Sequence, residues 1–422
     1  MPTKTIEDID VSGKTVLMRV DFNVPIKDGK VTNDKRIVGA LPSIRKVLEG
    51  GGMLVLMSHC GRPAGKGFEA EFSNKPAAER LSQLLGRSVK VGSGDVGGAE
   101  DVAAVQSLRP GEILLLENVR FNAGEDLIDK AKKNPDKKPT PEQEAKIKDF
   151  TGKLVRLGEI YVNDAFGTCH RKHVSMYGVA KAIQGKGGPA VAGYLVEKEI
   201  KYLSEAVASP KRPFVAILGG AKVSDKIKLI SNLLAKVDRI LIGGAMAYTL
   251  LKAKGTKVGA SRVEEDQVEE MKKLLASAAG KIMLPEDHVC TSTFDFKAMT
   301  GGKPTVVAGA DIPDNLMGMD IGPKTIRAFG AVIASAGTIV WNGPMGVFEA
   351  RDYAAGTKAI AEALAQATDK GAVSVIGGGD SATAVEELGL DKRMTHVSTG
   401  GGASLEYLEG KAMPPIEVLD KK

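Results

Sequence analysis

The sequence predicts an α/β protein built on parallel β-sheets. Two observations lead to this prediction. Short apolar runs of four to six residues recur along the chain and are separated by amphipathic helical patterns, which is typical of buried parallel strands with crossover helices. In the second half of the chain, a succession of apolar strand, glycine cluster and helix recurs at five places. The length of 422 residues predicts two or three domains of about 150 residues each.

In the first half, each apolar run ends in polar or charged residues. The helical patterns RIVGALPSIRKVLEGG and KPAAERLSQLLG lie between these runs. In open α/β sheets, ligands bind beyond the carboxyl ends of the strands, so the polar residues there are candidates for a binding site. TVLMRV leads to Asp21-Phe22-Asn23, MLVLM to Ser58-His59-Cys60-Gly61-Arg62, EILLLE to Asn118-Val119-Arg120, and EIYV to Asn163-Asp164.

In the second half, each predicted strand is followed by glycines. Glycine allows a sharp turn and lets backbone N–H groups approach an anion at a helix N-terminus. Any single junction of this kind can be purely structural, but five together favour a nucleotide-type domain. FVAIL leads to Gly219-Gly220-Ala221-Lys222, RILI to Gly243-Gly244, TIVW to Asn342-Gly343-Pro344, VSVI to Gly377-Gly378-Gly379-Asp380, and HVST to Gly400-Gly401-Gly402.

Two further segments complete the organisation. GYLVEKEIKYLSEAV lies between the halves, and its amphipathic pattern predicts a helix that connects two domains. Residues 129–149 are rich in lysine and proline, and we expect a solvated loop that runs into a surface helix. A nucleic-acid-binding patch in this segment is the weaker interpretation, because no aromatic residues alternate with the lysines.

Composition favours a cytoplasmic enzyme that acts on small anions. The net charge of +6 suits anionic substrates without requiring nucleic acid. Cys60, Cys169 and Cys290 are far apart and form no CxxC pair, which argues against disulfides and zinc and favours a reducing compartment. The N-terminus lacks a secretory signal pattern, and no apolar run reaches the ~18 residues that a membrane span needs.

Two motif matches are set aside. Residues 92–97, GSGDVG, match a dinucleotide fingerprint, but the following segment gives no convincing start of a helix. Gly13-Lys14-Thr15 resembles the end of a Walker A loop, but Asp8 stands where that motif needs glycine. A nicotinamide-dependent dehydrogenase and a non-catalytic nucleic-acid or scaffold protein are therefore the competing interpretations, and both are disfavoured.

Eight blocks in the same order resemble phosphoglycerate kinase from one end of the chain to the other. The departures are Cys60, Cys169, Lys172 and Ala245, and none replaces a residue expected to carry charge to the substrate. The blocks are RVDFNVP, SHCGRP, LLLENVRF, VNDAFGTCHRKH, LGGAKVSDKI, WNGPMGVFE, IGGGDSATA and VSTGGGASLE.

The resemblance implies two doubly wound, Rossmann-like domains joined by a helix, with a cleft between them. Residues 1–192, with a return of residues 404–422, would bind 3-phosphoglycerate or 1,3-bisphosphoglycerate, and residues 193–403 would bind ATP or ADP with Mg²⁺. The implied activity is reversible phosphoryl transfer between 1,3-bisphosphoglycerate and ADP in glycolysis and gluconeogenesis. The resemblance also suggests a hinge-bending, cytoplasmic monomer that binds neither nucleic acid nor membrane.

The resemblance also implies the site residues. The expected catalytic residues are Arg36, Lys222, Gly379 and Gly402. The expected ligands of the phosphoglycerate are Asp21, Phe22, Asn23, Arg36, His59, Cys60, Gly61, Arg62, Arg120 and Arg171, and His170 and His173 serve either this site or the domain interface. The expected nucleotide ligands are Gly220, Ala221, Lys222, Lys226, Gly244, Gly318, Asn342, Glu349, Gly377, Gly378, Gly379, Asp380 and Ser381, with Asp380 as the Mg²⁺ ligand.

These residue types suit the implied chemistry. Arginine binds phosphate in a bidentate way and stays charged, and Asp21 would orient an arginine or accept from a hydroxyl. Lys222 and Lys226 are expected on one face of a helix start. The attacking oxygen belongs to a carboxylate or to a phosphate, so the reaction needs no protein base, only alignment and neutralisation of charge.

Overall fold

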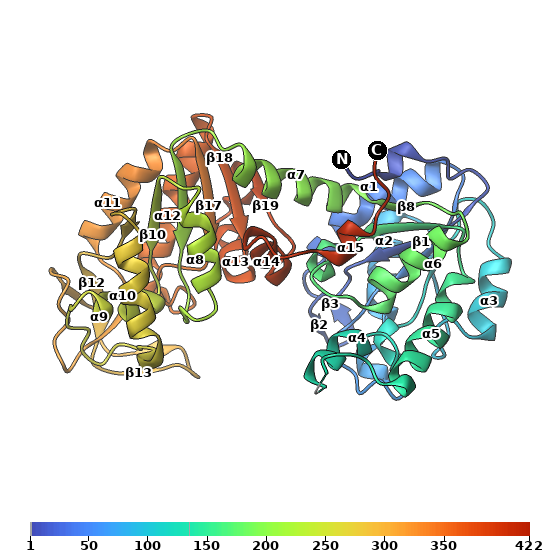
Figure 1. Ribbon diagram of the computed structural model, residues 1–422, viewed down its shortest axis with the longest axis horizontal. Helices are drawn as coiled ribbons and strands as arrows, with labels where there is room; N and C mark the ends of the chain where they lie inside the picture. The colour runs from blue at the N-terminus through green and yellow to red at the C-terminus, as the bar shows by residue number, and fades with distance from the viewer. Residues whose placement is uncertain (1, 135) are drawn as a thin grey trace. The chain divides into compact units, whose positions relative to one another are not determined.

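The computed structural model describes residues 2–134 and 136–422, the side chains of Glu205 and Val207 excepted, and it divides into two compact units (Figure 1). The first unit comprises Met1–Ile200 and Ala412–Lys422, and the second comprises Lys201–Lys411. The chain therefore changes unit later than the predicted boundaries at residues 192 and 404. One reason is that helix α14 (Gly402–Leu408) packs against α8 (Ile227–Leu234) of the second unit.

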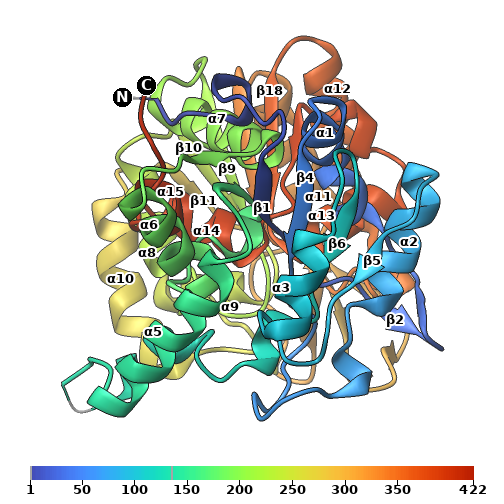
Figure 2. The same ribbon diagram turned by 90° about the vertical axis from the view of Figure 1, so that its right-hand side faces the viewer.

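The first unit is built on a parallel six-stranded sheet, as the sequence predicts. Figure 2 shows β1, β4, β6 and β5 side by side in this unit. The full order is β5-β6-β4-β1-β7-β8, so the strand order reverses at β1. The strands are β1 (Thr15–Val20), β4 (Met53–Met57), β5 (Lys90–Val91), β6 (Ile113–Leu115), β7 (Ile160–Asp164) and β8 (Ala190–Ala192), and every pairing between them is parallel.

Alternation along the strands gives this sheet two buried faces. Val16, Met18 and Val20 of β1 point to one face and pack with α1 (Lys35–Glu49) and α2 (Lys75–Leu85). Helix α6 (Val179–Gly185) packs on β7 and β8, and α5 (Pro141–Val155) packs on α6. Burial on both faces explains why the strands are continuous apolar runs rather than alternating ones.

The lysine-rich segment ends in the predicted surface helix, whereas its predicted loop is helical up to Lys133, and residue 135 lies outside the described residues. It begins with α4 (Leu127–Lys130), and α5 starts where Thr140 and Gln143 form a capping box around Pro141. This is the T-P-x-Q pattern that satisfies the free N–H groups of a first helical turn. The segment after GSGDVG also forms a helix, α3 (Ala99–Gln106), although its sequence gave no convincing start. Its N-cap is Gly98, which supplies no side-chain cap.

The second unit contains another parallel six-stranded sheet. Its order is β11-β10-β9-β17-β18-β19, which in chain order is 3-2-1-4-5-6, the order typical of doubly wound dinucleotide-binding sheets. All five predicted strands with following glycines belong to this sheet. The strands are β9 (Phe214–Leu218), β10 (Arg239–Ile242), β11 (Ile282–Met283), β17 (Thr338–Asn342), β18 (Val373–Gly377) and β19 (His396–Val397).

Helices cover the second sheet as well. Trp341, which is fully buried, packs with α11 (Pro323–Ala334) and α12 (Ala355–Asp369) on one face. The strands β12 (His288–Thr291), β15 (Thr305–Val307) and β16 (Met317–Ile321) form a small antiparallel sheet, beside a hairpin of β13 (Phe294–Asp295) and β14 (Thr300–Gly301). No sequence pattern predicted this addition. The remaining longer helices are α9 (Met246–Ala253), α10 (Val268–Ser277) and α13 (Gly379–Glu387).

The predicted connecting helix is α7 (Tyr194–Ala208), which leaves the first unit and enters the second. The chain returns to the first unit through α15 (Pro414–Glu417). There Lys4 N donates to Asp420 O (2.7 Å), and Thr3 forms an isolated antiparallel β-bridge with Lys421. The two termini accordingly lie next to each other (Figure 1).

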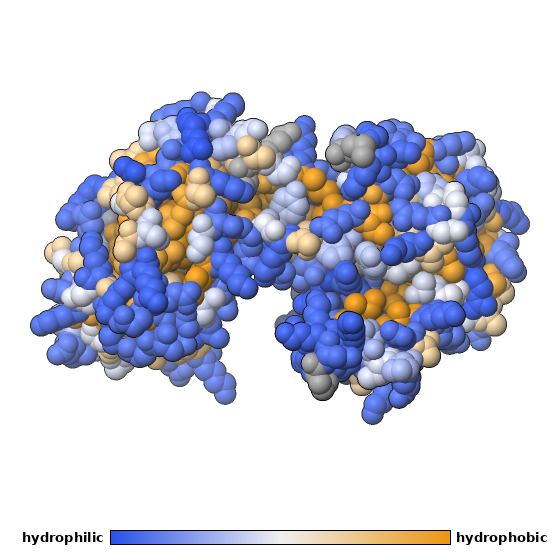
Figure 3. Space-filling view, viewed as in Figure 1, coloured by the Kyte–Doolittle hydropathy of each residue, from blue (hydrophilic) through white to orange (hydrophobic). Residues whose placement is uncertain are grey.

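The visible surface of each unit is mainly hydrophilic, and apolar areas show between the polar side chains (Figure 3). Within the described residues, no helix combines the length and the apolar character needed to cross a bilayer.

Candidate functional site

The two sheets place their polar loops at equivalent positions. In each sheet the strand order reverses between two neighbouring strands, β1 and β7 in the first unit and β9 and β17 in the second. Loops diverge at such a switch point and leave room for a ligand beyond the carboxyl ends of the strands. In the second unit, the loops after β9 and β17 are in contact where they leave the strands. A Cβ on Gly219 would lie 1.9 Å from Pro344 O, so this position requires glycine.

In the first unit, Arg36 is held by the loop that follows β1. Its Nη1 lies 3.3 Å from both Asp21 carboxylate oxygens and donates to Asn23 O at 3.0 Å. Asn23 Oδ1 in turn accepts from Gly61 N (2.8 Å), which joins this loop to the loop after β4. Asp21 therefore contacts an arginine, one of the two roles expected for it.

Arg120 lies on the neighbouring loop, and only some of its hydrogen-bond donors have partners. Its Nη1 donates to Gly61 O (2.7 Å), and its Nε is buried with no hydrogen-bond partner among the described residues. Burial, and then the nearby Arg19, lower the pKa of the Arg120 guanidinium. Asn118 fixes the loop, because its Nδ2 donates to Cys60 O at 2.6 Å. A half-buried guanidinium with an unused donor is suited to a bound anion.

His59 and Arg171 complete this cluster. Arg19 also belongs to it, although no sequence pattern had predicted a role for it. Arg19 is fully buried, and its Nη2 lies 3.2 Å from His59 Nδ1. Its position inside the apolar run TVLMRV gave no signal of a polar role. Arg171 Nε donates to His170 Nε2 (3.0 Å), and His173 lies 3.3 Å from Asp129 Oδ2.

The side chains of three predicted ligands do not join the cluster described so far. The Phe22 side chain is 1% exposed and belongs to the apolar core, so only its backbone could serve a ligand. Cys60 is buried and offers its carbonyl to Asn118. Arg62 is exposed, and no described residue pairs with it.

In the second unit, most predicted nucleotide ligands line one cavity of about 410 Å³. Four predicted residues are not among its lining: Gly244 packs on Gly220, Gly377 ends β18, Gly318 lies on β16 against Tyr248, and Glu349 is exposed. The lining residues are Gly220, Ala221, Lys222, Asp225, Lys226, Arg262, Asn342, Gly343, Gly378, Gly379, Asp380, Ser381, Gly401, Gly402 and Leu405.

The two predicted lysines lie in the loop before α8, not on a helix. We expected Lys222 and Lys226 one helical turn apart, but α8 begins at Ile227 and the residues before it form turns. Lys226 Nζ donates to Asn342 O (2.9 Å) and Oδ1 (2.6 Å), and burial lowers its pKa to about 8. Lys222 is exposed, and no described residue forms an ion pair with it, so its charge is available to a ligand.

Two helix N-termini face the same cavity. Helix α13 begins at Gly379 after Gly378 (φ +86°), and α14 begins at Gly402 after Gly401 (φ +50°). Positive φ at these caps favours glycine and turns the first N–H groups of each helix outward. Free N–H groups and the helix dipole together favour phosphate oxygens.

Arg262 and Glu264 were also missed by the sequence analysis. Arg262 lines the cavity, and Glu264 accepts from Val223 N (2.5 Å) and Ser224 Oγ (2.5 Å) in the loop that carries Lys222. Both come from the segment SRVEED, which contains no strand end or glycine cluster. Only the tertiary structure brings this segment to the loop after β9.

Asp164 lies at the end of β7 but supports the structure instead of facing a ligand. It is 1% exposed, and its Oδ1 accepts from Leu195 N (2.8 Å) and Val196 N (3.4 Å) at the start of α7. Burial raises its pKa to about 7, an effect that these hydrogen bonds and Ser43 only partly oppose. The carboxylate therefore caps the connecting helix.

The raised pKa makes stability depend on pH. The folded state holds the Asp164 proton up to about pH 7, whereas an unfolded aspartate loses it near pH ~4. The contribution of this bound proton to the free energy of unfolding is complete below pH ~4. It is lost as pH rises through about 7. Relative to Asp164→Asn, we expect the wild type to lose about 3 kcal/mol of unfolding free energy between pH 5 and pH 8. Urea unfolding of both proteins at the two pH values tests this, and a pH-independent difference would contradict it.

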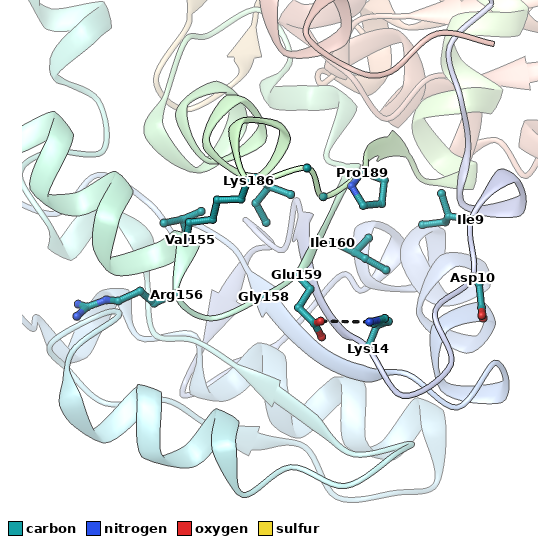
Figure 4. A pocket seen from close by; sticks show the side chains of 13 residues that line it. Ile9, Asp10, Lys14, Val155, Arg156, Gly158, Glu159, Ile160, Lys186 and Pro189 are labelled. Carbon is teal, nitrogen blue, oxygen red and sulfur yellow. Dashed lines mark hydrogen bonds and ion pairs between the residues drawn. The ribbon is translucent and has the colours of Figure 1, made fainter.

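A larger cavity, of about 710 Å³, lies in the first unit at the amino ends of β1, β7 and β8 (Figure 4). Two of its apolar lining residues, Ile160 and Ile183, are only 3% and 1% exposed, so these two offer little surface to a ligand. Lys14 and Glu159 pair with each other at 3.4 Å on its rim. The arginines and glycine-rich turns that the sequence analysis singled out lie instead near the carboxyl ends of the strands.

Comparisons with known proteins agree with this geometry. The family model described as phosphoglycerate kinase matches residues 6–411. Phosphoglycerate kinases from Chlorobium phaeobacteroides (strain BS1) and Rhodopirellula baltica are 52% and 51% identical to this chain, each with 100% of both chains covered. The solved phosphoglycerate kinase of Coxiella burnetii aligns with a TM-score of 0.84 and 37% identity, covering 99% of this chain and 98% of that one. That of Pyrococcus horikoshii aligns with a TM-score of 0.80 and 32% identity, with the same coverage.

Proposed function

The chain belongs to the phosphoglycerate kinase family and is a phosphotransferase with a carboxyl group as acceptor, and from this premise we propose how its two units divide the reaction. The first unit binds 3-phosphoglycerate or 1,3-bisphosphoglycerate through Arg36, Arg120, Arg171 and His59. The second unit binds ADP or ATP in its 410 Å³ cavity. The observation that carries this proposal is that each sheet gathers cationic side chains beyond the carboxyl ends of its strands, Arg36 and Arg120 in the first unit and Lys222 and Lys226 in the second.

The proposed mechanism needs positioning and charge neutralisation only. A carboxylate with an ordinary pKa near ~4 is already ionised at neutral pH and can attack a phosphoryl group without a base. Arg36 and Arg120 would orient the carboxylate and phosphate ends of the acceptor. Lys222 and the first N–H groups of α13 and α14 would stabilise the charge on the group in transfer.

We further propose that Mg²⁺ accompanies the nucleotide. Asp380 and Asp225 are the carboxylates that line the cavity, and Mg²⁺ with a nucleotide commonly takes one or two carboxylates plus phosphate oxygens and water. These residues fit that donor set, with Asp380 as the proposed ligand. When bound, the ion would neutralise phosphate charge. Among the described residues, no group of three or more His, Cys, Asp or Glu side chains is placed to hold a metal ion.

The activity is tested by following phosphoryl transfer from MgATP to 3-phosphoglycerate, with the product coupled to NADH oxidation by glyceraldehyde-phosphate dehydrogenase. We expect turnover that disappears when EDTA removes Mg²⁺ and returns when excess Mg²⁺ is added. Circular dichroism in EDTA should show an unchanged fold, because the proposed ion binds with the nucleotide. Turnover that persists in EDTA would contradict the magnesium proposal, and no turnover from folded, ADP-binding protein would contradict the acceptor.

Two properties of the whole protein complete the proposal. We propose a monomer, which sedimentation velocity with both substrates present would test. We also propose a cytoplasmic location, which the three free, buried cysteines support because they suit a reducing compartment.

A further inference from the structure

A chain of buried hydrogen bonds runs from Glu125 to His59 in the first unit. Ser175 Oγ donates to Glu125 Oε1 (2.6 Å), and Arg19 Nε donates to Ser175 Oγ (2.9 Å). Arg19 Nη2 then reaches His59 Nδ1 at 3.2 Å. The first three residues are fully buried, and His59 is 6% exposed, so water does not compete for these groups.

Chemistry fixes which group donates in each hydrogen bond between Glu125 and His59. A guanidinium can only donate, so His59 Nδ1 must accept, and the single proton of the neutral imidazole must lie on Nε2. Ser175 has one O–H, and because Arg19 donates to its oxygen, that O–H is left for Glu125. Glu125 Oε2 also accepts from Ser175 N (2.9 Å), which holds the serine in place.

The charges around His59 also favour the neutral imidazole. Burial lowers the pKa of His59 well below its ordinary value, and Arg19, Arg120, His173 and Arg36 lower it further. Among the described residues, the carboxylate at ion-pair distance from His59 is Asp21, whose Oδ1 lies 3.9 Å from His59 Nδ1. That oxygen also lies 3.3 Å from Arg36, so its charge is shared.

We propose that Glu125 and Ser175 are positioning residues for the first unit's anion site. Through Arg19 they keep His59 as a neutral imidazole that presents its Nε2–H as a donor. This inference rests on the proposed function only in assigning that donor to 3-phosphoglycerate. The tautomer itself is a property of the free protein.

The test is ¹⁵N NMR of the imidazole nitrogens in the full-length protein without ligand, with His59 assigned by loss of its signals in His59→Gln. We expect the Nε2–H tautomer, with a titration midpoint well below ~6.5. Ser175→Ala should produce a mixture of tautomers and raise the KM for 3-phosphoglycerate by roughly tenfold, since a hydrogen bond to a charged group is lost. The KM for ATP, which belongs to the second unit, should stay unchanged.

Ser43→Ala is the matched control, because Ser43 is equally buried but accepts from Tyr194 N instead. It should leave the His59 signals as in the wild type. An Nδ1–H tautomer in the wild type would overturn the proposal, even if Ser175→Ala did not fold. So would wild-type His59 signals in folded Ser175→Ala. If the protein showed the Nε2–H tautomer but no kinase activity, the proposed function would fail while this inference held.

Discussion

Replacing Lys222 by glutamine is expected to lower kcat by roughly 100- to 1,000-fold, the loss typical of removing one charge-stabilising group from a transition state. Lys222 lines the second unit's cavity, and no described residue competes for its charge. Because its side chain is exposed, the free energy of unfolding should change by only about 0.5 kcal/mol or less. The coupled assay at saturating MgATP and 3-phosphoglycerate measures kcat, and urea unfolding measures stability.

Lys228→Gln is the matched control for this prediction. Lys228 is also exposed and has the same side chain, but it lies on α8 outside the cavity lining. We expect nearly normal kcat from this variant. If Lys222→Gln kept near-normal kcat, Lys222 would not stabilise the transferring group. If both variants lost activity alike, the effect would come from net charge and not from position.

Strand positions could be predicted from the sequence because both faces of each sheet are buried. Runs such as TVLMRV and FVAIL form β1 and β9, and the residues that follow them lie at the switch points. The resemblance to the family added the site residues, and the structure gathers most of them into one cluster in each unit.

The remaining features depend on tertiary contacts that no local pattern encodes. Arg19 reads as an interruption in an apolar strand, but the fold buries it against Ser175 and His59. Glu264 reads as a surface charge, but the fold brings it to the loop after β9. The spacing of Lys222 and Lys226 suggested a helix, whereas the turns before Ile227 bring Lys226 to Asn342 instead.

Arg36 illustrates how a predicted ligand is prepared by its neighbours. Its guanidinium is held by two carboxylate oxygens of Asp21 and by Asn23 O before any substrate arrives. These contacts reduce the side-chain entropy that binding would otherwise cost. They use Nη1, so the described contacts leave its other N–H groups available for a phosphate or carboxylate.

Replacing Arg36 by glutamine is therefore expected to lower kcat/KM for 3-phosphoglycerate by at least ~100-fold, because a charged, bidentate donor is lost where the reacting groups must be aligned. The KM for ATP should change far less, since that ligand belongs to the second unit. Steady-state kinetics with each substrate varied in turn separates the two effects. Arg45→Gln is the control, because Arg45 is exposed on the same helix and no described residue pairs with it. Near-normal kcat/KM in folded Arg36→Gln would show that the Asp21–Arg36 pair stabilises the loop after β1 and does not bind the acceptor.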